Sequence, residues 1–388
     1  MLDLGGEYQL CADEIRAAIE AVLESRQFIG GPAVIELEKA LSSRVGVEHA
    51  VAVSSGTDAL LCTMMGLDIG HGDEVILPAF TFFATAGSVA RLGAKPVFVD
   101  IDPRTFNVDP DKIEAAITDR TRAIIAVHLF GQCAEMNAIN AIATRHHLTV
   151  IEDAAQAIGA AYHGRPAGAL GDVACVSFYP TKNLGGFGEG GMIFTSDEHL
   201  AGIARQLRNH GESQRYVHER VGGNFRLDTM KAAILLVRLR YLDQFTKRRR
   251  DNAARYNALL EEVPVTTPYV PAHQTEVYHQ YSILCDRRDE LRSFLQKRGV
   301  HSAVYYPVPL HLQKCFAFVG CRRGSLPVTE QLCDRILSLP CHPMLTEADL
   351  QYVASGVQEF YARFAPTCAT ASDTHGATEP RSANVGKE

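Results

Sequence analysis

Between about residue 33 and about residue 155, short runs rich in valine and isoleucine alternate with segments whose apolar residues recur at helical spacing. A strand of a parallel sheet is buried on both faces and is therefore continuously apolar, whereas a covering helix is apolar on one side. The alternation predicts a parallel sheet covered by helices in an α/β domain. The predicted strands are "HAVAVS", "EVILPA", "KPVFVD", "RAIIAVH" and "LTVIED", and the predicted helices between them are "IELEKALSSRV", "TDALLCTMMGL" and residues 136–146.

The rest of the chain predicts further elements of this domain and then a second, smaller domain. Residues 173–195 read as strand, turn, strand, and helices are expected near residues 198–208, 227–241 and 243–261. Further on, "YHQYSIL" and "HSAVYY" predict strands, and "RDELRSFLQKRG", residues 327–336 and residues 346–363 predict helices. We therefore expect a large α/β domain over residues 1–250, including the N-terminal segment, and a small α+β domain over residues 251–364. Residues 365–388 have almost no large apolar side chains and predict a disordered tail.

Composition and charge exclude several classes of function. The formal net charge of −7 argues against a general affinity for nucleic acid or anionic membranes, and the basic run "KRRR" lies among acidic residues, as on a solvated helix face. Ten cysteines without a CxxC pair, no secretory leader and no apolar run of membrane-spanning length indicate a soluble cytoplasmic protein with reduced thiols. The histidines show no metal-binding spacing, so no metal is expected.

Polar residues with possible chemistry follow the predicted strands, where open α/β sheets bind ligands. The first strand leads into "SSGT" at the start of a helix, which is a possible phosphate cradle or an ordinary N-cap. Asp153 ends a very apolar strand, where a carboxylate needs a partner. Lys182 precedes a run of glycines, whose formal G-x-G-x-x-G match is weak because the glycines lead into a strand and not a helix.

Together these groups fit a pyridine aldehyde phosphate. Such a cofactor needs a lysine for a Schiff base, a carboxylate that keeps the ring nitrogen protonated, and helix-end amides for its phosphate. Each feature has an ordinary explanation when taken alone: a surface lysine, a helix cap, a strand-end hydroxyl. Their coincidence in one chain favours the cofactor site.

Seven motifs follow one another along the chain: "SSGTDAL", "PAFTFFATA", "VHLFGQCAEM", "EDAAQAIGA", "SFYPTKNLGGFGEGGM", "NFRLDTMKAAIL" and "YYPVPLHLQ". In these motifs and their order, from about residue 28 to about residue 345, the sequence resembles the DegT/DnrJ/EryC1/StrS family of pyridoxal-phosphate sugar aminotransferases. The resemblance implies the aspartate aminotransferase (type I) fold, with a large domain built on a mainly parallel sheet and a smaller α+β C-terminal domain.

The resemblance also implies roles for individual residues. Lys182 would be the Schiff-base lysine and Asp153 the partner of the pyridine nitrogen. The other implied cofactor-binding residues are Gly56, Thr57, Phe82, Gln156, Ser177 and Asn224. Asn224 would come from the neighbouring subunit, so the protein would be a homodimer with shared active sites. Arg226, Tyr306 and His311 would face the substrates.

The implied reaction is transfer of an amino group from L-glutamate to a nucleotide-linked keto-sugar by a ping-pong mechanism, in amino-sugar biosynthesis. Pyridoxamine 5′-phosphate would be the intermediate form of the cofactor. The segments "RYVHERVGGNFRLDTMKAAIL" and "YYPVPLH" resemble members that act on 3-keto sugars, including UDP-hexuluronic acids. Two alternatives remain: a cofactor-binding regulatory protein without turnover, and a pyridoxamine-phosphate-dependent sugar dehydratase. Dehydratases of the family typically carry histidine where this chain has Lys182.

Overall fold

The centre of the molecule is a seven-stranded sheet with the strand order β1-β9-β8-β5-β4-β2-β3. The computed structural model describes residues 1–364, so the predicted tail at 365–388 lies outside the described residues. The strands are β1 (His49–Val53), β2 (Glu74–Pro78), β3 (Lys95–Val99), β4 (Thr121–Val127), β5 (Thr149–Asp153), β8 (Val173–Ser177) and β9 (Gly191–Thr195). Strand β9 is antiparallel to β1 and β8, while β8, β5, β4, β2 and β3 pair in parallel. The predicted α/β class and the five predicted strands are confirmed.

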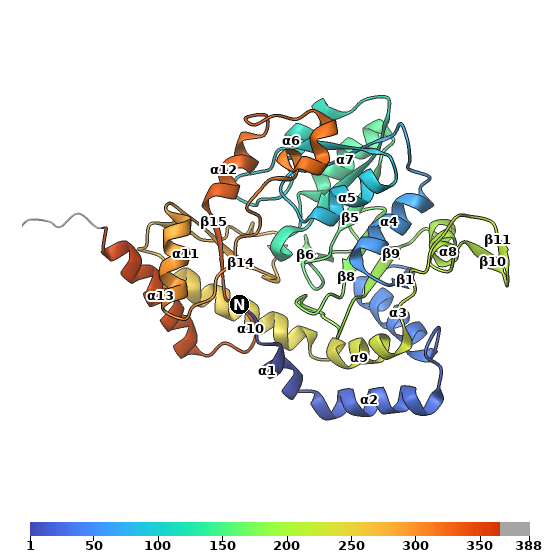
Figure 1. Cartoon of the computed structure of the whole chain (residues 1–388), viewed down its shortest axis with the longest axis horizontal. Helices are drawn as coiled ribbons and strands as arrows, with labels where there is room; N and C mark the ends of the chain where they lie inside the picture. The colour runs from blue at the N-terminus through green and yellow to red at the C-terminus, as the bar shows by residue number, and fades with distance from the viewer. Residues whose placement is uncertain (365–388) are drawn as a thin grey trace, which may run out of the picture.

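Helices cover both faces of this sheet (Figure 1). The helices of this part are α1 (Leu4–Gln9), α2 (Ala12–Ser25), α3 (Pro32–Val45), α4 (Gly56–Gly66), α5 (Phe83–Arg91), α6 (Pro110–Ile113), α7 (Met136–His146), α8 (Glu198–Leu207) and α9 (Thr229–Leu239). Consecutive residues of one strand belong to different cores: Ile124 packs in the cluster that includes α3, α7 and α9, and Ile125 in the cluster with α4, α5 and α8. Both faces of β4 are therefore buried along most of its length, which explains its continuously apolar run.

A second group of elements surrounds a three-stranded antiparallel sheet. Its elements are α10 (Leu242–Leu259), β12 (Val265–Thr266), β14 (Tyr281–Cys285), α11 (Arg288–Lys297), α12 (Pro327–Arg335), β15 (Ile336–Leu339) and α13 (Glu347–Ala362). Along α10, Leu242 packs in a core of the large sheet, whereas Ala253 and Tyr256 pack in a separate core with α11 and α13. This change of core supports the predicted domain boundary at residue 250, which remains a prediction.

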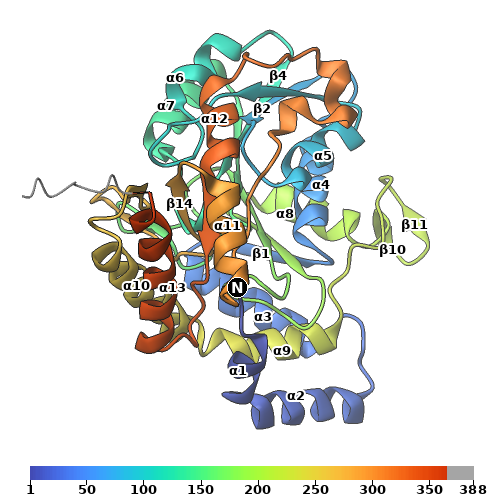
Figure 2. The same cartoon turned by 60° about the vertical axis from the view of Figure 1, so that its left-hand side comes forward.

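Short elements connect these parts. They are the strands β6 (Ala161–Tyr162), β7 (Arg165–Pro166), β10 (Glu212–Gln214), β11 (Val217–His218) and β13 (Gln274–Thr275), and the 3₁₀ turns η1 (Glu114–Ala116), η2 (Leu129–Gly131), η3 (Leu310–Leu312) and η4 (Lys314–Val319). Strand β13 pairs with β6, which ties the second group to the large domain. The β10–β11 hairpin projects from the molecule in both views (Figures 1 and 2).

The prediction of a strand at "HSAVYY" is wrong. Strand β14 already pairs with β12 on one side and β15 on the other, so this segment can reach only the outer edge of β15. There, Ala303 forms a single bridge with Ser338. Pro307 and Pro309 follow closely, and proline has no N–H group to continue a ladder.

Candidate active site

Three of the predicted site segments meet at one edge of the large sheet. Strands β1, β5 and β8 run in the same direction, and at their carboxyl ends lie the Ser54–Ser55 turn, Asp153 and Ser177. Polar side chains that follow parallel strands converge at this edge, where ligands bind in such folds. The sheet therefore brings together residues that are more than 100 positions apart in sequence.

The start of helix α4 forms an anion-accepting cradle. Ser55 caps the helix by accepting a hydrogen bond from the Asp58 amide (3.0 Å), and the first intrahelical bond runs from Ala59 N to Ser55 O (2.9 Å). The amides of Gly56 and Thr57 are left without an acceptor inside the helix. A Cβ atom at Gly56 would lie 2.7 Å from Cβ of Ser177, so glycine allows the helix to approach the end of β8 this closely.

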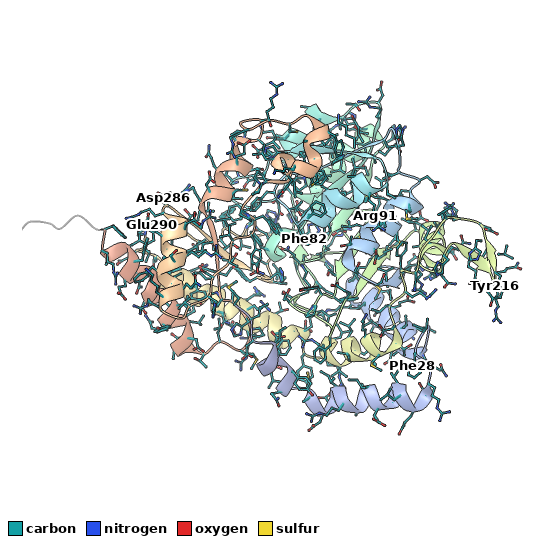
Figure 3. All side chains as sticks on the ribbon, viewed as in Figure 1. Phe28, Phe82, Arg91, Tyr216, Asp286 and Glu290 are labelled. Atoms are coloured by element: carbon teal, nitrogen blue, oxygen red, sulfur yellow. The ribbon has the colours of Figure 1, made fainter. Side chains whose placement is uncertain are left out.

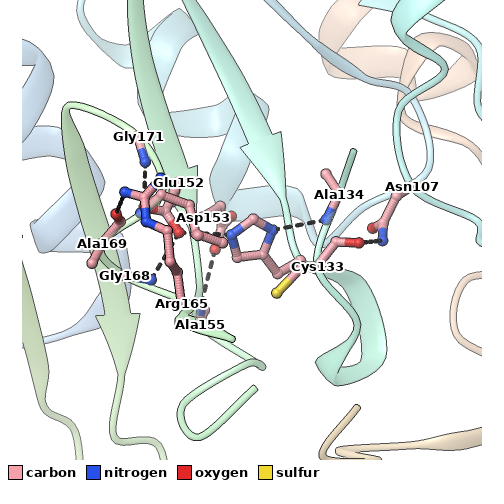
Figure 4. Close-up of polar contacts among 12 residues, drawn as sticks. Asn107, Cys133, Ala134, Glu152, Asp153, Ala155, Arg165, Gly168, Ala169 and Gly171 are labelled. Carbon is pink, nitrogen blue, oxygen red and sulfur yellow. Dashed lines mark hydrogen bonds and ion pairs between the residues drawn. The ribbon is translucent and has the colours of Figure 1, made fainter. Parts of the chain in front are cut away.

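Asp153 is buried at the end of β5, with 6% of its surface exposed. Its Oδ2 accepts a hydrogen bond from Thr85 Oγ1 (2.7 Å), and its Oδ1 accepts a longer one from the Ala155 amide (3.3 Å). Figure 4 shows Asp153 at the strand end beside Ala155. A buried carboxylate with these two partners is held in one orientation and can face a cation.

Lys182 lies in the loop between β8 and β9 and is half-buried. Its backbone amide donates to Tyr179 O (2.8 Å) in a tight turn. Burial lowers the pKa of the Lys182 amine to about 8, although the negative charge of Asp153 acts in the opposite direction. The charge of Asp153 thus acts on the amine of Lys182, and the amine is partly neutral near physiological pH.

Gln156 links the strand-end loop to two other segments. Its Oε1 accepts a hydrogen bond from the Phe130 amide (2.7 Å), and its Nε2 donates to the hydroxyl of Tyr306 (3.3 Å). Burial raises the pKa of the Tyr306 hydroxyl, so Tyr306 stays a neutral hydrogen-bonding group. Phe82 is 55% exposed, and its ring centroid lies 6.3 Å from that of Tyr306. Figure 3 shows Phe82 near the middle of the view, where an exposed ring could lie against a planar ligand.

Asn224 and Arg226 lie on the strand-like segment beside the end of β1. Phe225 O accepts a hydrogen bond from Ser54 N (2.7 Å), which places this segment next to the cradle turn. Asn224 is exposed. Arg226 donates from Nη1 to Asn209 Oδ1, while its buried Nε has no partner among residues 1–364.

His311 has a different environment from the other predicted residues. It is 2% exposed, and its Nε2 lies 3.0 Å from Glu330 Oε1 on α12. Glu330 also accepts hydrogen bonds from the Gly324 amide. The contacts of His311 Nε2 therefore tie η3 to α12, and its role toward a substrate stays a prediction.

A second buried pair supports the strand that carries Asp153. His128 Nδ1 accepts a hydrogen bond from the Ala134 amide (3.1 Å), so the ring proton resides on Nε2, which donates to Glu152 Oε2 (2.8 Å). Burial alone would raise the pKa of Glu152, but the hydrogen bonds from His128 and the amides of Gly168 and Gly171 hold this pKa below its usual value. Figure 4 shows this network next to Asp153, on the neighbouring residue of β5.

Comparison with known proteins identifies the family of the chain. Residues 9–358 match the DegT/DnrJ/EryC1/StrS aminotransferase family. The chain belongs to this family. Its predicted membership and fold are therefore confirmed.

Two curated relatives differ in the function that their names give, one being a regulatory protein and the other an aminotransferase. The chain is 50% identical over 368 residues to a pleiotropic regulatory protein of Geobacillus stearothermophilus, covering 94% of this chain and 99% of the relative. It is 46% identical over 356 residues to a UDP-2-acetamido-2-deoxy-3-oxo-D-glucuronate aminotransferase of Pseudomonas aeruginosa, covering 92% and 98%. Among solved structures, S. venezuelae DesV in complex with a ketimine intermediate has a TM-score of 0.91 at 43% identity, covering 92% of this chain and 97% of that one.

Sequence reasoning missed several residues of this family member's site. Thr85 binds Asp153 directly, and the Phe130 amide holds Gln156. Asn183 donates to Val277 O (3.0 Å) and so fixes the lysine loop to the segment between β13 and β14. The spacing of Thr81 and Thr85, four residues apart at a predicted strand end, was the one available signal for Thr85.

Among residues 1–364, no helix combines the length and apolar character needed to cross a bilayer. The same residues contain no group of three or more His, Cys, Asp or Glu side chains arranged to hold a metal ion.

Proposed function

We propose that the protein transfers an amino group from L-glutamate to a nucleotide-linked keto-sugar, with pyridoxal 5′-phosphate as cofactor and pyridoxamine 5′-phosphate as its intermediate form. The observation that carries the proposal is the convergence of Lys182, Asp153 and the start of α4 at one sheet edge. We expect this reaction to take place in the cytoplasm. The homology of the chain to sugar aminotransferases over most of its length supports the reaction class.

The residues present fit the cofactor. The unpaired amides of Gly56 and Thr57 and the hydroxyl of Ser177 offer donors to a phosphate, and the positive end of the α4 dipole favours an anion there. Asp153 offers a fixed negative charge to a protonated ring nitrogen. Phe82 offers an exposed ring face. When bound, pyridoxal phosphate supplies an electron sink for the negative charge that develops at the donor's α-carbon.

Lys182 is the group that moves protons in this proposal. Because burial holds the pKa of the Lys182 amine near 8, part of the amine is neutral near physiological pH, and the neutral form is both nucleophilic and basic. The amine first holds the cofactor. Once freed by the donor amine, the Lys182 amine would carry a proton between the donor's α-carbon and the C4′ atom of the cofactor, and it would carry the proton in the reverse direction for the keto-sugar.

Asp153 keeps the ring nitrogen protonated during these transfers. Its carboxylate is buried and oriented by Thr85, so it provides a fixed counter-charge in a site of low dielectric. No step requires Asp153 to change its protonation state.

For the acceptor we favour a 3-keto sugar nucleotide, with a UDP-hexuluronic acid as the leading candidate. The similarity to the Pseudomonas aeruginosa enzyme supports this choice. Arg226 is the candidate partner for a carboxylate, because its guanidinium makes one hydrogen bond and has an unpartnered Nε. That carboxylate could belong to the hexuluronate or to glutamate.

Turnover tests the proposal. Purified protein with cofactor, L-glutamate and a UDP-linked 3-keto-hexuluronate should form 2-oxoglutarate and the amino sugar. Lys182→Ala should abolish this activity, while Lys247→Ala, which removes an exposed lysine paired with Asp251, should leave it unchanged. Cofactor binding without 2-oxoglutarate formation would instead support the alternative of a cofactor-binding regulatory protein without turnover. The similarity to the regulatory protein of Geobacillus stearothermophilus is the observation that favours this alternative.

Arg226→Met assigns the carboxylate that Arg226 binds. Loss of the glutamate half-reaction would assign Arg226 to the donor, whereas a defect confined to the sugar half-reaction would assign it to the acceptor. An unchanged rate in both half-reactions would remove Arg226 from the site.

A further inference from the structure

A chain of two threonine hydroxyls ends on the carboxylate of Asp153. Thr85 Oγ1 lies 2.7 Å from Asp153 Oδ2, and Thr81 Oγ1 lies 3.0 Å from Thr85 Oγ1. All three side chains are buried, and Thr85 is fully so. Thr85 lies in the first turn of α5, and it is 68 positions away from Asp153 in sequence.

The direction of these hydrogen bonds follows from the chemistry of the groups. An ionised carboxylate can only accept, so the Thr85 hydroxyl donates its single proton to Asp153. The oxygen of Thr85 is then free to accept, and the Thr81 hydroxyl must be the donor in the second bond. Each bond polarises the next, which strengthens the donation to Asp153.

The hydroxyl of Thr85 is not used to stabilise its own helix. A threonine in a helix commonly donates to the carbonyl three or four residues earlier. The hydroxyl of Thr85 instead donates to Asp153 at the end of β5. A helix-stabilising role therefore does not account for this hydroxyl.

We propose that Thr85, held by Thr81, is a positioning residue that fixes the carboxylate of Asp153 toward the ring nitrogen of the bound cofactor. This inference rests on the proposed placement of Asp153 beside that nitrogen. A hydrogen bond from a buried hydroxyl holds a carboxylate in one orientation. Without it, the carboxylate of Asp153 would be free to turn and would hold the proton on the ring nitrogen less firmly.

The geometry also leaves one oxygen of Asp153 available. Oδ2 is occupied by Thr85, whereas Oδ1 accepts only the longer bond from the Ala155 amide among the described residues. The short bond from Thr85 therefore fixes the carboxylate and leaves Oδ1 as the acceptor for a ring N–H group.

The pH titration of the holoenzyme's visible absorbance tests this role without turnover. A protonated ring nitrogen withdraws electrons and keeps the pKa low at the nitrogen that joins Lys182 to the cofactor. Thr85→Val preserves the shape of the side chain and removes the hydroxyl. It should shift the titration midpoint upward and lower kcat by about 10- to 100-fold, with little change in KM for glutamate. Thr85→Ser should restore both values.

Two further variants complete the experiment. Thr63→Val is the matched control, because Thr63 is equally buried but its hydroxyl contacts Cys175 Sγ (3.3 Å), not a carboxylate. Its titration midpoint should equal that of the wild type. Thr81→Val should give a smaller upward shift than Thr85→Val, and it carries the test if Thr85→Val does not fold.

Asp153→Asn separates failure of this inference from failure of the proposed site. If Asp153→Asn shifts the midpoint while neither Thr85→Val nor Thr81→Val does, the hydroxyl chain has no such role and the inference is overturned. If Asp153→Asn also leaves the midpoint unchanged, Asp153 does not hold the ring nitrogen, and both the placement and the inference fall.

Discussion

At the scale of single residues, two opposing influences set the pKa of the Lys182 amine. Burial lowers the pKa of its amine to about 8, and the charge of Asp153 limits that decrease. Without Asp153, burial would leave the amine with an even lower pKa. The balance gives an amine that can exist in both protonation states near neutral pH, which a proton-transfer group requires.

This balance predicts the pH dependence of cofactor capture. Only the neutral amine attacks the cofactor aldehyde, so the initial rate of capture by the apoprotein should rise with pH with a midpoint near 8. Stopped-flow absorbance after mixing with pyridoxal phosphate measures this rate. A midpoint near the ordinary lysine value, about 10.5, would contradict the burial of Lys182.

The sequence predicted part of the residue-scale chemistry. Asp153 and Lys182 could be recognised in the sequence because each lies at or after the end of an apolar strand. A charged side chain is rare there unless it has a partner or a chemical role. Thr85 and Phe130 could not be recognised, because their roles depend on contacts with Asp153 and Gln156 that only the folded sheet creates. A hydrogen bond from a backbone amide leaves no trace in the side-chain pattern.

At the scale of elements, the start of α4 depends on its close approach to β8. A side chain at Gly56 would meet Ser177 Cβ at 2.7 Å, and neither the helix start nor the strand end can move without disturbing the cradle. The parallel strands themselves were predictable from their apolar runs. "HSAVYY" was not, because its alternation resembles a strand although β15 leaves it only an outer edge.

Gly56→Ala should therefore weaken cofactor binding. Separating the cradle from Ser177 should raise the dissociation constant of pyridoxal phosphate by about tenfold or more. Gly202→Ala is the matched control, since a Cβ there would meet nothing within 4 Å, and it should leave binding unchanged. Equal affinities of the two variants, measured by fluorescence titration of the apoproteins, would show that the close approach is not required.

At the scale of the whole molecule, the described chain leaves many large apolar side chains exposed. Phe28, Phe82 and Tyr216 are among them, and Figure 3 shows their spread across one view of the molecule. Asn224 is exposed as well. These features fit a homodimer in which each subunit completes the other's site.

Mixing two inactive variants tests this shared site. Lys182→Ala and Asn224→Ala each retain the residue that the other lacks. If Asn224 acts on the neighbouring subunit, random reassortment makes half of the dimers hybrid, each with one intact site, and about a quarter of the wild-type activity should return. If Asn224 acts within its own subunit, no hybrid contains an intact site and no activity should appear.

We propose that Lys182, Asp153 and the start of α4 together form a working site for amino-group transfer. The most direct measurement is the absorbance spectrum of the purified holoprotein before and after addition of L-glutamate. We expect a visible band from the lysine-bound cofactor that is replaced by the near-ultraviolet band of pyridoxamine phosphate, with release of one equivalent of 2-oxoglutarate per site. A protein that remains colourless with added cofactor, or whose visible band does not respond to glutamate, would show that these residues do not form such a site.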